Sequence, residues 1–338
     1  MERGSPLLHR IADPENLRLA YWKAARHKRD REDAKAFGAC LDEELAALVE
    51  GIRDASLPLG RHRFFTIHDP KERTICAACF RERVLHHAIM NVCEPFLDRF
   101  QISDSFACRK RRGRTAAVAR AAGCTRTCAW FVRLDVHKYY DSIHHDTLKG
   151  LLRRRFDDEG LLGLFGRIID AYEVAPGRGV PIGHLTSQHF GNLYLGAFDR
   201  HVKQRLRLRA YMRYMDDMAA WSDRKDELMA FREEAVRYLR DELRLELNPG
   251  GHVNRVTHGC GLLGYRLYPD RTRLSRRSAI RFRRRLASDE ERWHEGLWDD
   301  DSLVMHVEPK LAFVREADSL AFRRQVLATG ASPQARTA

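Results

Sequence analysis

Long hydrophobic runs are missing from this sequence of 338 residues, of which 44% are hydrophobic and 32% are charged. No stretch reaches the roughly 20 apolar residues that a helix needs to cross a bilayer. The opening residues, MERGSPLLHR, also lack the apolar run of a secretion signal. The sequence therefore predicts a cytoplasmic globular protein with no membrane partner, long enough for two or three packed subdomains.

An excess of acidic residues is also missing. Lysine and arginine number 60 against 47 aspartates and glutamates, which gives a formal net charge of +13. Such a balance favours a polyanionic partner, most commonly nucleic acid, with an anionic membrane surface as the alternative. Arginine is concentrated in CRKRRGR at 108–114 and in RTRLSRRSAIRFRRRL at 271–286. This clustering favours a binding surface over a generally basic composition.

The cysteines lack the setting of a zinc knuckle. CAAC at 76–79 and CTRTC at 124–128 have suggestive spacing, but neither lies in a Gly- or Pro-rich loop. Both segments show helix or strand periodicity, so we expect reduced, partly buried thiols rather than zinc ligands. The eight cysteines are Cys40, Cys76, Cys79, Cys93, Cys108, Cys124, Cys128 and Cys260.

Helical and strand patterns alternate along the chain, without the regular βαβ order of a doubly wound sheet and without an internal repeat. This order predicts an α+β fold. The expected helices are 15–55, 82–100, 187–206, 224–243 and the Arg-rich remainder after 270, and the expected strands lie within 63–77, 130–136, 211–221 and 261–269. The tail after Gly330 is expected to be disordered.

Two adjacent aspartates interrupt the strand-like segment YMRYMDDMAAW at 211–221. Asp216 and Asp217 fit the turn of a hairpin, where Asp is common, but a type I′ turn favours Gly or Asn. Like charges at one tip repel each other, and a bound divalent cation would remove that repulsion. Asp135, at the end of an apolar strand, and Asp141 add further carboxylates.

Carboxylate oxygens suit Mg²⁺ or Mn²⁺ better than zinc. Two such ions can activate a 3′-hydroxyl and stabilise the pyrophosphate that leaves in a phosphoryl transfer. Together with a basic surface, this carboxylate set predicts a nucleotidyl polymerase.

The same residues resemble a known family, the reverse transcriptases. YMDD at 214–217 is similar to their catalytic hairpin, and RLDVHKYYDSI at 133–143 to their first aspartate motif. The resemblance implies that Asp135 and Asp216 bind two Mg²⁺ ions, with Mn²⁺ as a possible substitute. Asp217 would complete the acidic set and Val136 would belong to the metal site, while Asp141 would play a supporting role.

The resemblance also implies a nucleotide site. Tyr140 would be the aromatic gate against the 2′-hydroxyl of ribonucleotides, with core packing as its alternative role. HDPKERTI at 68–75 is similar to the fingers hairpin, where Lys71 and Arg73 would contact the triphosphate of the incoming deoxynucleotide. The alternative for these two cations is an ordinary solvated surface.

The likeness extends over about residues 60–270 and implies a right-hand polymerase fold. Arg109, in the segment after the fingers helix, and Arg281, Arg283 and Arg284, in the thumb, would bind nucleic acid phosphates. GLLGYRLYP at 261–269 resembles the primer grip. The implied division is a helical extension at 1–60, fingers at 61–125, palm at 126–260, primer grip and helical thumb at 261–330, and a disordered tail at 331–338.

The segment VPIGHLTSQHFGNLYL at 180–195 indicates a subgroup. Many family members carry Gln-Gly and Ser-Pro here, whereas this chain has Ile182 before Gly183 and Gln188 after serine. This pattern resembles the reverse transcriptases of diversity-generating retroelements. It implies error-prone copying of a structured template RNA into cDNA, opposite adenine above all, with a small basic accessory protein that forms an oligomeric ring.

Two alternatives remain at this point. A phage-defence or retron-type reverse transcriptase would share the chemistry, and a non-catalytic RNA-binding protein would share the scaffold but need no acidic triad. One departure from the family also matters, because LNPGGHVNR at 247–255 has no lysine to protonate the leaving pyrophosphate. His252 could supply that proton, or the step could rely on metal and water.

Overall fold

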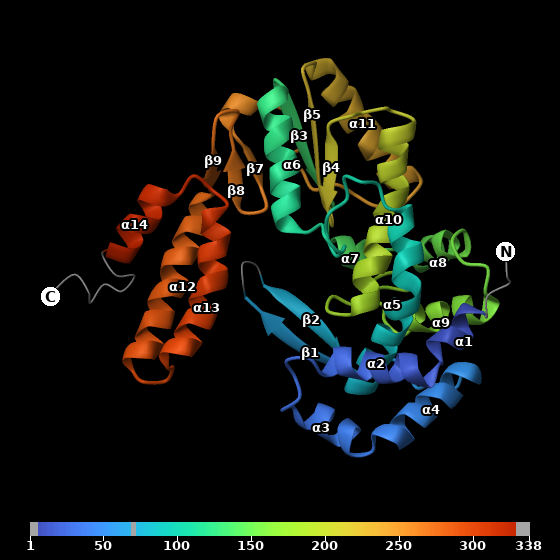
Figure 1. The fold of residues 1–338 in the computed structure, drawn as a ribbon. Helices are drawn as coiled ribbons and strands as arrows, with labels where there is room; N and C mark the ends of the chain where they lie inside the picture. The colour runs from blue at the N-terminus through green and yellow to red at the C-terminus, as the bar shows by residue number, and fades with distance from the viewer. Residues whose placement is uncertain (1–5, 69–71, 329–338) are drawn as a thin grey trace.

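The centre of the molecule is a four-stranded antiparallel sheet with the strand order β4-β5-β3-β6 (Figure 1). A computed structural model describes residues 6–68 and 72–328 of the chain. The strands are β3 (Trp130–Asp135), β4 (Tyr211–Tyr214), β5 (Asp217–Ser222) and β6 (Asn254–Arg255). The predicted strand at 130–136 and the predicted hairpin at 211–221 are confirmed.

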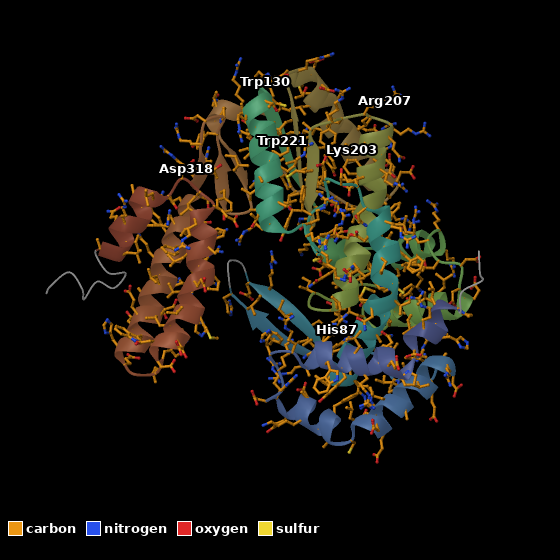
Figure 2. The ribbon with its side chains drawn as sticks, viewed as in Figure 1. His87, Trp130, Lys203, Arg207, Trp221 and Asp318 are labelled. Atoms are coloured by element: carbon orange, nitrogen blue, oxygen red, sulfur yellow. The ribbon has the colours of Figure 1, made fainter. Side chains whose placement is uncertain are left out.

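Both faces of this sheet are buried, which explains its nearly continuous apolar strands. Val132 and Leu134 join the main core with α10 (Leu185–Gln204) and α11 (Lys225–Asp241). Phe131 precedes Val132 on β3, so its side chain points to the opposite face of the sheet. There it belongs to a second core with α6 (Arg114–Thr127). Trp221 lies on this second face, and its Nε1 donates a hydrogen bond of 3.1 Å to Thr125 Oγ1 of α6 (Figure 2).

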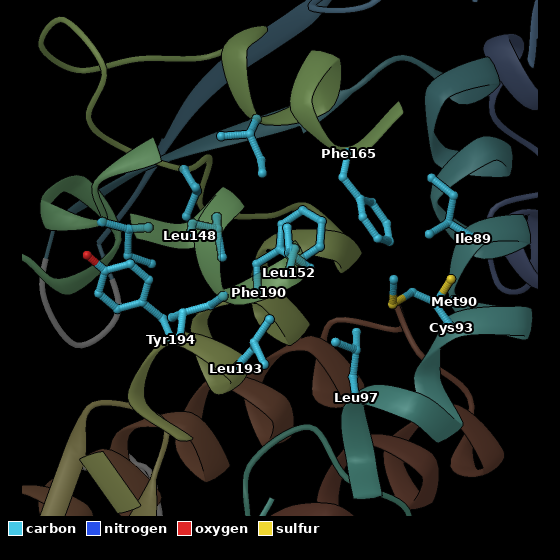
Figure 3. Close-up of a cluster of buried hydrophobic side chains, with 14 of the residues drawn as sticks. Ile89, Met90, Cys93, Leu97, Leu148, Leu152, Phe165, Phe190, Leu193 and Tyr194 are labelled. Atoms are coloured by element: carbon cyan, nitrogen blue, oxygen red, sulfur yellow. The ribbon is translucent and has the colours of Figure 1, made fainter. Parts of the chain in front are cut away.

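The main core continues below the sheet into a helical body. Figure 3 shows side chains from α5, α8, α9 and α10 pointing toward one another there, among them Leu97, Leu152, Phe165 and Phe190. The helices of this body are α1 (Leu7–Ile11), α2 (Pro14–Ala25), α3 (Glu32–Ala39), α4 (Leu41–Arg53), α5 (Phe80–Phe100), α7 (Tyr139–Ser142), α8 (His145–Arg153) and α9 (Glu159–Asp170). The helices predicted at 15–55 and 82–100 are confirmed.

A two-stranded hairpin projects from this body, formed by β1 (His62–Ile67) and β2 (Arg73–Ala78). It confirms the strand pair predicted within 63–77. The turn at 69–71, which includes Lys71, lies outside the described residues.

The C-terminal part adds a three-stranded sheet, which packs in the second core with α6, and three helices (Figure 1). It contains η1 (Val256–His258), β7 (Cys260–Leu262), β8 (Tyr265–Leu267), β9 (Thr272–Leu274), α12 (Arg276–His294), α13 (Asp300–Arg315) and α14 (Leu320–Ala328). Helices α12–α14 enclose a small core that includes Phe282, Leu286 and Val314. The helix expected directly after 270 begins late, because Thr272 and Leu274 pair with β8 before Ser275 caps α12. The predicted tail at 331–338 lies outside the described residues.

The expected α+β class is confirmed by these antiparallel sheets and their helices. Within the described part of the chain, no helix combines the length and the apolar character that crossing a membrane requires.

One buried ion pair ties the sheet to its surroundings. Arg213 of β4 and Asp199 of α10 are both fully buried, with 2.7 Å between Arg213 Nη2 and Asp199 Oδ2. Tyr211 donates a further hydrogen bond of 2.7 Å to the same carboxylate. The remaining guanidinium contacts are with oxygens of Gln101, Ser105, Asn192 and Met215. The pair therefore joins β4, α10, the segment after α5 and the turn after β4.

Replacing Arg213 with Met should destabilise the fold by about 3–5 kcal/mol, because Asp199 would keep a buried charge without its cation. The free energy of urea unfolding measures this effect. The matched control is Arg240→Met, which removes an arginine whose side chain is 65% exposed beside Asp241 and should leave the urea midpoint unchanged. The double variant Arg213→Met/Asp199→Leu should recover part of the loss. An Arg213→Met variant as stable as the parent would contradict this account.

Candidate active site

The β4–β5 turn and the end of β3 bring three carboxylates together. Asp135 and Asp217 are directly opposite each other in the β3–β5 ladder, so their side chains share one face. Asp216 lies in the turn itself, after Met215, whose φ of 56° is left-handed. Arg213 Nη1 fixes this turn through a 2.8 Å hydrogen bond to the Met215 carbonyl. The structure thus assembles the predicted acidic set from two separate segments.

The electrostatics of Asp216 are unfavourable for its ionised form. Burial raises the pKa of this carboxyl to about 6, and the negative charges of Asp135 and Asp217 add to the rise. The positive charge of Arg73 acts in the opposite direction. A cation bound between the carboxylates would compensate both burial and repulsion. Their oxygen atoms are the donor type that hard divalent cations prefer, so the residues present fit such a metal.

Asp135 is held by a residue that the sequence analysis missed. Asn248 Nδ2 donates a hydrogen bond of 2.8 Å to Asp135 Oδ2, and Asn248 N donates another of 2.8 Å to the Asp135 carbonyl. His137 Nδ1 lies 2.9 Å from Asn248 Oδ1, which orients the amide. Asn248 belongs to the loop at 247–255, which lacks the lysine of other family members, and nothing in its spacing pointed to Asp135.

Asp217 has a cationic partner that also went unnoticed. Arg133 Nη2 lies 2.5 Å from Asp217 Oδ1, so one carboxylate oxygen is already engaged. Arg133 and Asp135 are two positions apart on β3 and therefore project from the same face. The sequence contained a signal for this contact, since Arg133 interrupts an otherwise apolar strand. Asp217 is consequently less available to a metal than its two neighbours.

Val136 lies immediately after Asp135, with 2% of its surface exposed. Its carbonyl oxygen is 3.4 Å from Asn248 Nδ2. His252, the candidate proton donor, is exposed, and its own carbonyl accepts a hydrogen bond from Asn254. Both assignments stay predictions.

Tyr140 flanks the carboxylates on α7. Burial raises its pKa, the negative charge of Asp216 contributes to the rise, and Arg73 opposes it. Arg73 of β2 and Tyr140 thus lie within electrostatic reach of one another and of the acidic set. A Cβ atom added at Gly191 would lie 3.7 Å from Tyr140 Cε1, so α10 supports the ring from one side.

The turn before α10 packs against the fingers hairpin. Cys76 N of β2 donates a hydrogen bond of 2.8 Å to the Ile182 carbonyl. Gly183 has a φ of +121°, and a Cβ atom there would lie 2.7 Å from the Cys76 carbonyl oxygen, so only glycine fits. On α10, Gln188 Oε1 accepts a hydrogen bond of 3.3 Å from Cys108 Sγ. The hydrogen-bonding capacity of Gln188 is therefore partly used inside the protein.

The arginines expected to bind nucleic acid differ in their surroundings. Arg109 is turned inward: its side chain is only 10% exposed, its Nε lies 2.5 Å from Asp98, and its Nη1 reaches the Ile102 and Ser105 carbonyls. This guanidinium braces the loop after α5 instead of facing solvent. On α12, Arg284 and Arg283 are exposed, and Arg283 also lies over the Phe322 ring, 5.1 Å from its centroid. Arg281 is half-buried.

The model of one protein family, "Reverse transcriptase (RNA-dependent DNA polymerase)", matches residues 68–267, which include the whole carboxylate set. The chain belongs to the reverse transcriptase family. Membership makes it an enzyme of the RNA-directed DNA polymerase class, and reverse transcriptases use divalent metal ions for catalysis. The family match thus agrees with the hard-cation chemistry of the three carboxylates.

Curated relatives of this reverse transcriptase include bacterial and fungal proteins. Protein YkfC of Escherichia coli is 26% identical over 283 residues, which covers 69% of this chain and 74% of that protein. The putative COX1/OXI3 intron 2 protein of Saccharomyces cerevisiae is 22% identical over 132 residues. That match covers 37% of this chain but only 16% of the yeast protein.

Solved structures with a similar fold include two telomerases. Apo telomerase from Candida tropicalis superposes with a TM-score of 0.53 at 11% identity, covering 86% of this chain and 64% of that one. Telomerase from Candida albicans in complex with a TWJ fragment of telomeric RNA has a TM-score of 0.50, also at 11% identity, with 82% and 57% covered. The chain spans less than two thirds of either telomerase. The likeness concerns the fold and confirms the polymerase fold expected for this reverse transcriptase.

Asp216→Asn should lower primer extension at least about a hundredfold, since even residues behind metal ligands cost 10- to 100-fold when lost. The amide removes one negative charge but keeps the shape of the turn. Primer extension on an RNA template measures the rate, and retention of RNA in a filter-binding assay shows that the fold and the basic surface persist. Asp241→Asn, an exposed carboxylate on α11, is the control and should behave as the parent. Extension by Asp216→Asn at the parental rate would remove Asp216 from the metal site.

Tyr140→Ala should raise the incorporation of ribonucleotides relative to deoxyribonucleotides. The expected reason is steric, because a ring that packs against the incoming sugar would leave no room for a 2′-hydroxyl. Competing both sugars on one template measures the ratio. Tyr140→Phe keeps the ring and should keep the parental selectivity. If Tyr140→Ala selected sugars as the parent does, the ring would belong to the core packing alone.

Proposed function

We propose that this reverse transcriptase copies a structured template RNA into error-prone, adenine-mutagenised cDNA as part of a diversity-generating retroelement. It would act in the cytoplasm and be encoded by a bacterium or a phage. The observation that carries the proposal is Ile182. Its carbonyl is fixed to β2 beside the acidic set, and its side chain is half-buried. Many family members have glutamine here, and an aliphatic side chain can neither donate nor accept a hydrogen bond.

The chemistry assigned to the site is transfer of a nucleotidyl group to a primer. Asp135, Asp216 and Asp217, with the Val136 carbonyl, would hold two Mg²⁺ ions, for which Mn²⁺ could substitute. Bound there, the ions would activate the 3′-hydroxyl and stabilise the departing pyrophosphate. Asn248 keeps Asp135 oriented, and the Arg213 contact keeps the turn with Asp216 in place.

The nucleotide would lie between Tyr140, the Ile182–Gly183 turn and the fingers hairpin. Arg73, whose charge is felt at Asp216, would approach the triphosphate of the incoming deoxynucleotide, with Lys71 from the hairpin turn. The Gly183 backbone would line the base side of the site, and Gln188 would support it from α10.

The template–primer duplex would contact the exposed arginines of α12. Arg283 and Arg284 carry charge into solvent, and Arg281 adds to the same helix. The net charge of +13 supports an RNA partner and is compatible with recruitment of that RNA by a basic accessory protein in an oligomeric ring. Arg109 has no part in this surface, because its guanidinium is held by Asp98.

A phage-defence or retron-type reverse transcriptase is the competing assignment, since it requires the same carboxylates and the same fold. The Ile182 and Gln188 pair favours the diversity-generating type. The gene neighbourhood would separate the two assignments. A gene for a diversity-generating reverse transcriptase should lie beside a gene for a small basic protein and two near-identical repeats.

Ile182→Gln should lower misincorporation opposite template adenine about two- to tenfold, the value of one hydrogen bond of about 0.5–1.5 kcal/mol. The effect should be largest at adenine, because the resemblance implies errors opposite adenine above all and an adenine pair is held by only two hydrogen bonds. Sequencing of cDNA made by both enzymes on one RNA measures the error rate at each template base. The backbone bond from Cys76 to residue 182 is independent of the side chain, so synthesis should continue.

Ile182→Val is the matched control, since it changes volume but not hydrogen-bonding capacity, and its error spectrum should equal that of the parent. An adenine error rate that is unchanged in Ile182→Gln would mean that this position does not set fidelity. A parent enzyme that is accurate opposite adenine would reject the diversity-generating assignment itself.

A further inference from the structure

A cluster of metal-ligating side chains lies at the root of the fingers hairpin, away from the carboxylates. It consists of His62 on β1, Cys76 on β2 and His184, which caps α10. One ligand atom from each residue lies within 4.8 Å of the other two. Cys76 and His184 are 1% and 3% exposed, and Cys76 Sγ is 3.8 Å from His184 Nε2.

The fold imposes this proximity. In the β1–β2 ladder His62 pairs with Ala78 and Phe64 pairs with Cys76, so His62 and Cys76 are diagonal neighbours on one face. The hydrogen bond from Cys76 N to the Ile182 carbonyl brings the α10 turn to the same place, and His184 follows two residues later. The rings of His62 and His184 have centroids 5.0 Å apart.

A second feature points independently to a ligand. His86 of α5 is 2% exposed, and its Nε2 has no hydrogen-bond partner among the residues that the structure describes. Its ring centroid is 4.9 Å from that of His184. A buried imidazole nitrogen without a partner is costly, and a metal-bound water beside it would satisfy it.

A buried carboxylate, that of Glu82, lies near the cluster and could balance part of the positive charge of a bound metal ion. Glu82 is buried, and its carboxylate accepts hydrogen bonds from Gly60 N at 2.8 Å and from Cys79 Sγ at 3.6 Å. Cys79 therefore faces Glu82 and stays outside the cluster. The two cysteines of CAAC are thus divided, and only Cys76 meets the histidines. A metal at Cys76 would depart from the expectation that neither cysteine of this pair is a zinc ligand.

We propose that His62, Cys76 and His184 bind a zinc-class divalent ion that fastens the fingers hairpin to the turn before α10. Two imidazoles and a thiolate are the ligands that zinc prefers, and a water completes the tetrahedron beside His86. Zinc–ligand bonds of about 2.0–2.3 Å place neighbouring ligand atoms about 3.3–3.6 Å apart. The 3.8 Å between Cys76 Sγ and His184 Nε2 is close to this spacing. The His62 ligand atom lies within 4.8 Å of the other two, so the His62 ring would have to move inward to reach the same spacing.

The site would be structural and would act on the polymerase at a distance. It joins β2, which carries Arg73, to the turn of Ile182 and Gly183, the two sides of the proposed nucleotide site. Metal binding would therefore fix the fingers hairpin relative to the palm. The inference does not depend on the template or on the carboxylates, so its test is separate from that of the proposed function.

The test uses the full chain, purified with a tag that contains no histidine and dialysed against excess Mg²⁺ to occupy the carboxylates. Elemental analysis should find about one zinc per chain. Cobalt(II) added to the metal-free protein should give the thiolate-to-cobalt charge-transfer absorption of a cysteine ligand, and zinc should displace it.

Cys76→Ser should abolish the charge-transfer band and lower the retained zinc at least about tenfold, since one of three protein ligands is lost. The matched control Cys79→Ser, whose thiol faces Glu82, should keep both signals. His62→Gln, at a half-buried position, provides a second variant in case Cys76→Ser does not fold, and it should also lose zinc. The proposal would be overturned if the parent protein retained no zinc. It would also be overturned if the parent, Cys76→Ser and His62→Gln retained equal amounts of zinc. In either case His62, Cys76 and His184 would be a packed cluster without a metal.

Discussion

The buried ion pair of Arg213 and Asp199 is the contact on which the rest of the active site depends. A buried charge is tolerated only when it is paired and fully hydrogen-bonded, and here the guanidinium reaches oxygens on four other residues. Those oxygens belong to α10, to the segment after α5 and to the turn that carries Asp216. Satisfying one arginine therefore fixes the positions of three segments at once. The turn that carries Asp216 is held through the Met215 carbonyl, and Met215 itself adopts a left-handed φ of 56°.

Around the acidic set, the protein balances charge locally. Arg133 engages Asp217, Arg73 moderates the charge of Asp216, and an uncharged amide, Asn248, holds Asp135. This graded arrangement leaves Asp135 and Asp216 as the carboxylates with the most unmet negative charge. Because, of the three, only Asp217 is paired directly with a cation in the described part of the protein, the other two carboxylates stay available to bound metal ions. Salt bridges to all three carboxylates would leave no ligand for a metal.

Local features of the fold could be predicted from the sequence, and features that need distant partners could not. The β4–β5 hairpin follows from a short apolar run interrupted by two aspartates, and the buried face of α5 follows from helical spacing. Strand β9 was missed because Thr272–Leu274 has no apolar alternation of its own and exists through pairing with β8. Asp135 and Asp216 were found because their residue types are unusual where they occur. Asn248, the His62–Cys76–His184 cluster and the inward turn of Arg109 are products of tertiary packing, and no spacing in the chain encodes them.

The hydrogen bond between Asp135 and Asn248 spans 113 positions of the chain. Its consequence concerns synthesis on the ribosome, where the N-terminal part of a chain emerges and folds first. Helices α1–α5 can pack as soon as they are made, since most of their contacts are with one another. Strand β3 emerges without β5, without β6 and without its amide donor, and it stays an unfinished edge until residue 255 has been added. The nascent chain is therefore unable to hold the Asp135 carboxylate in place before about three quarters of its 338 residues have been added.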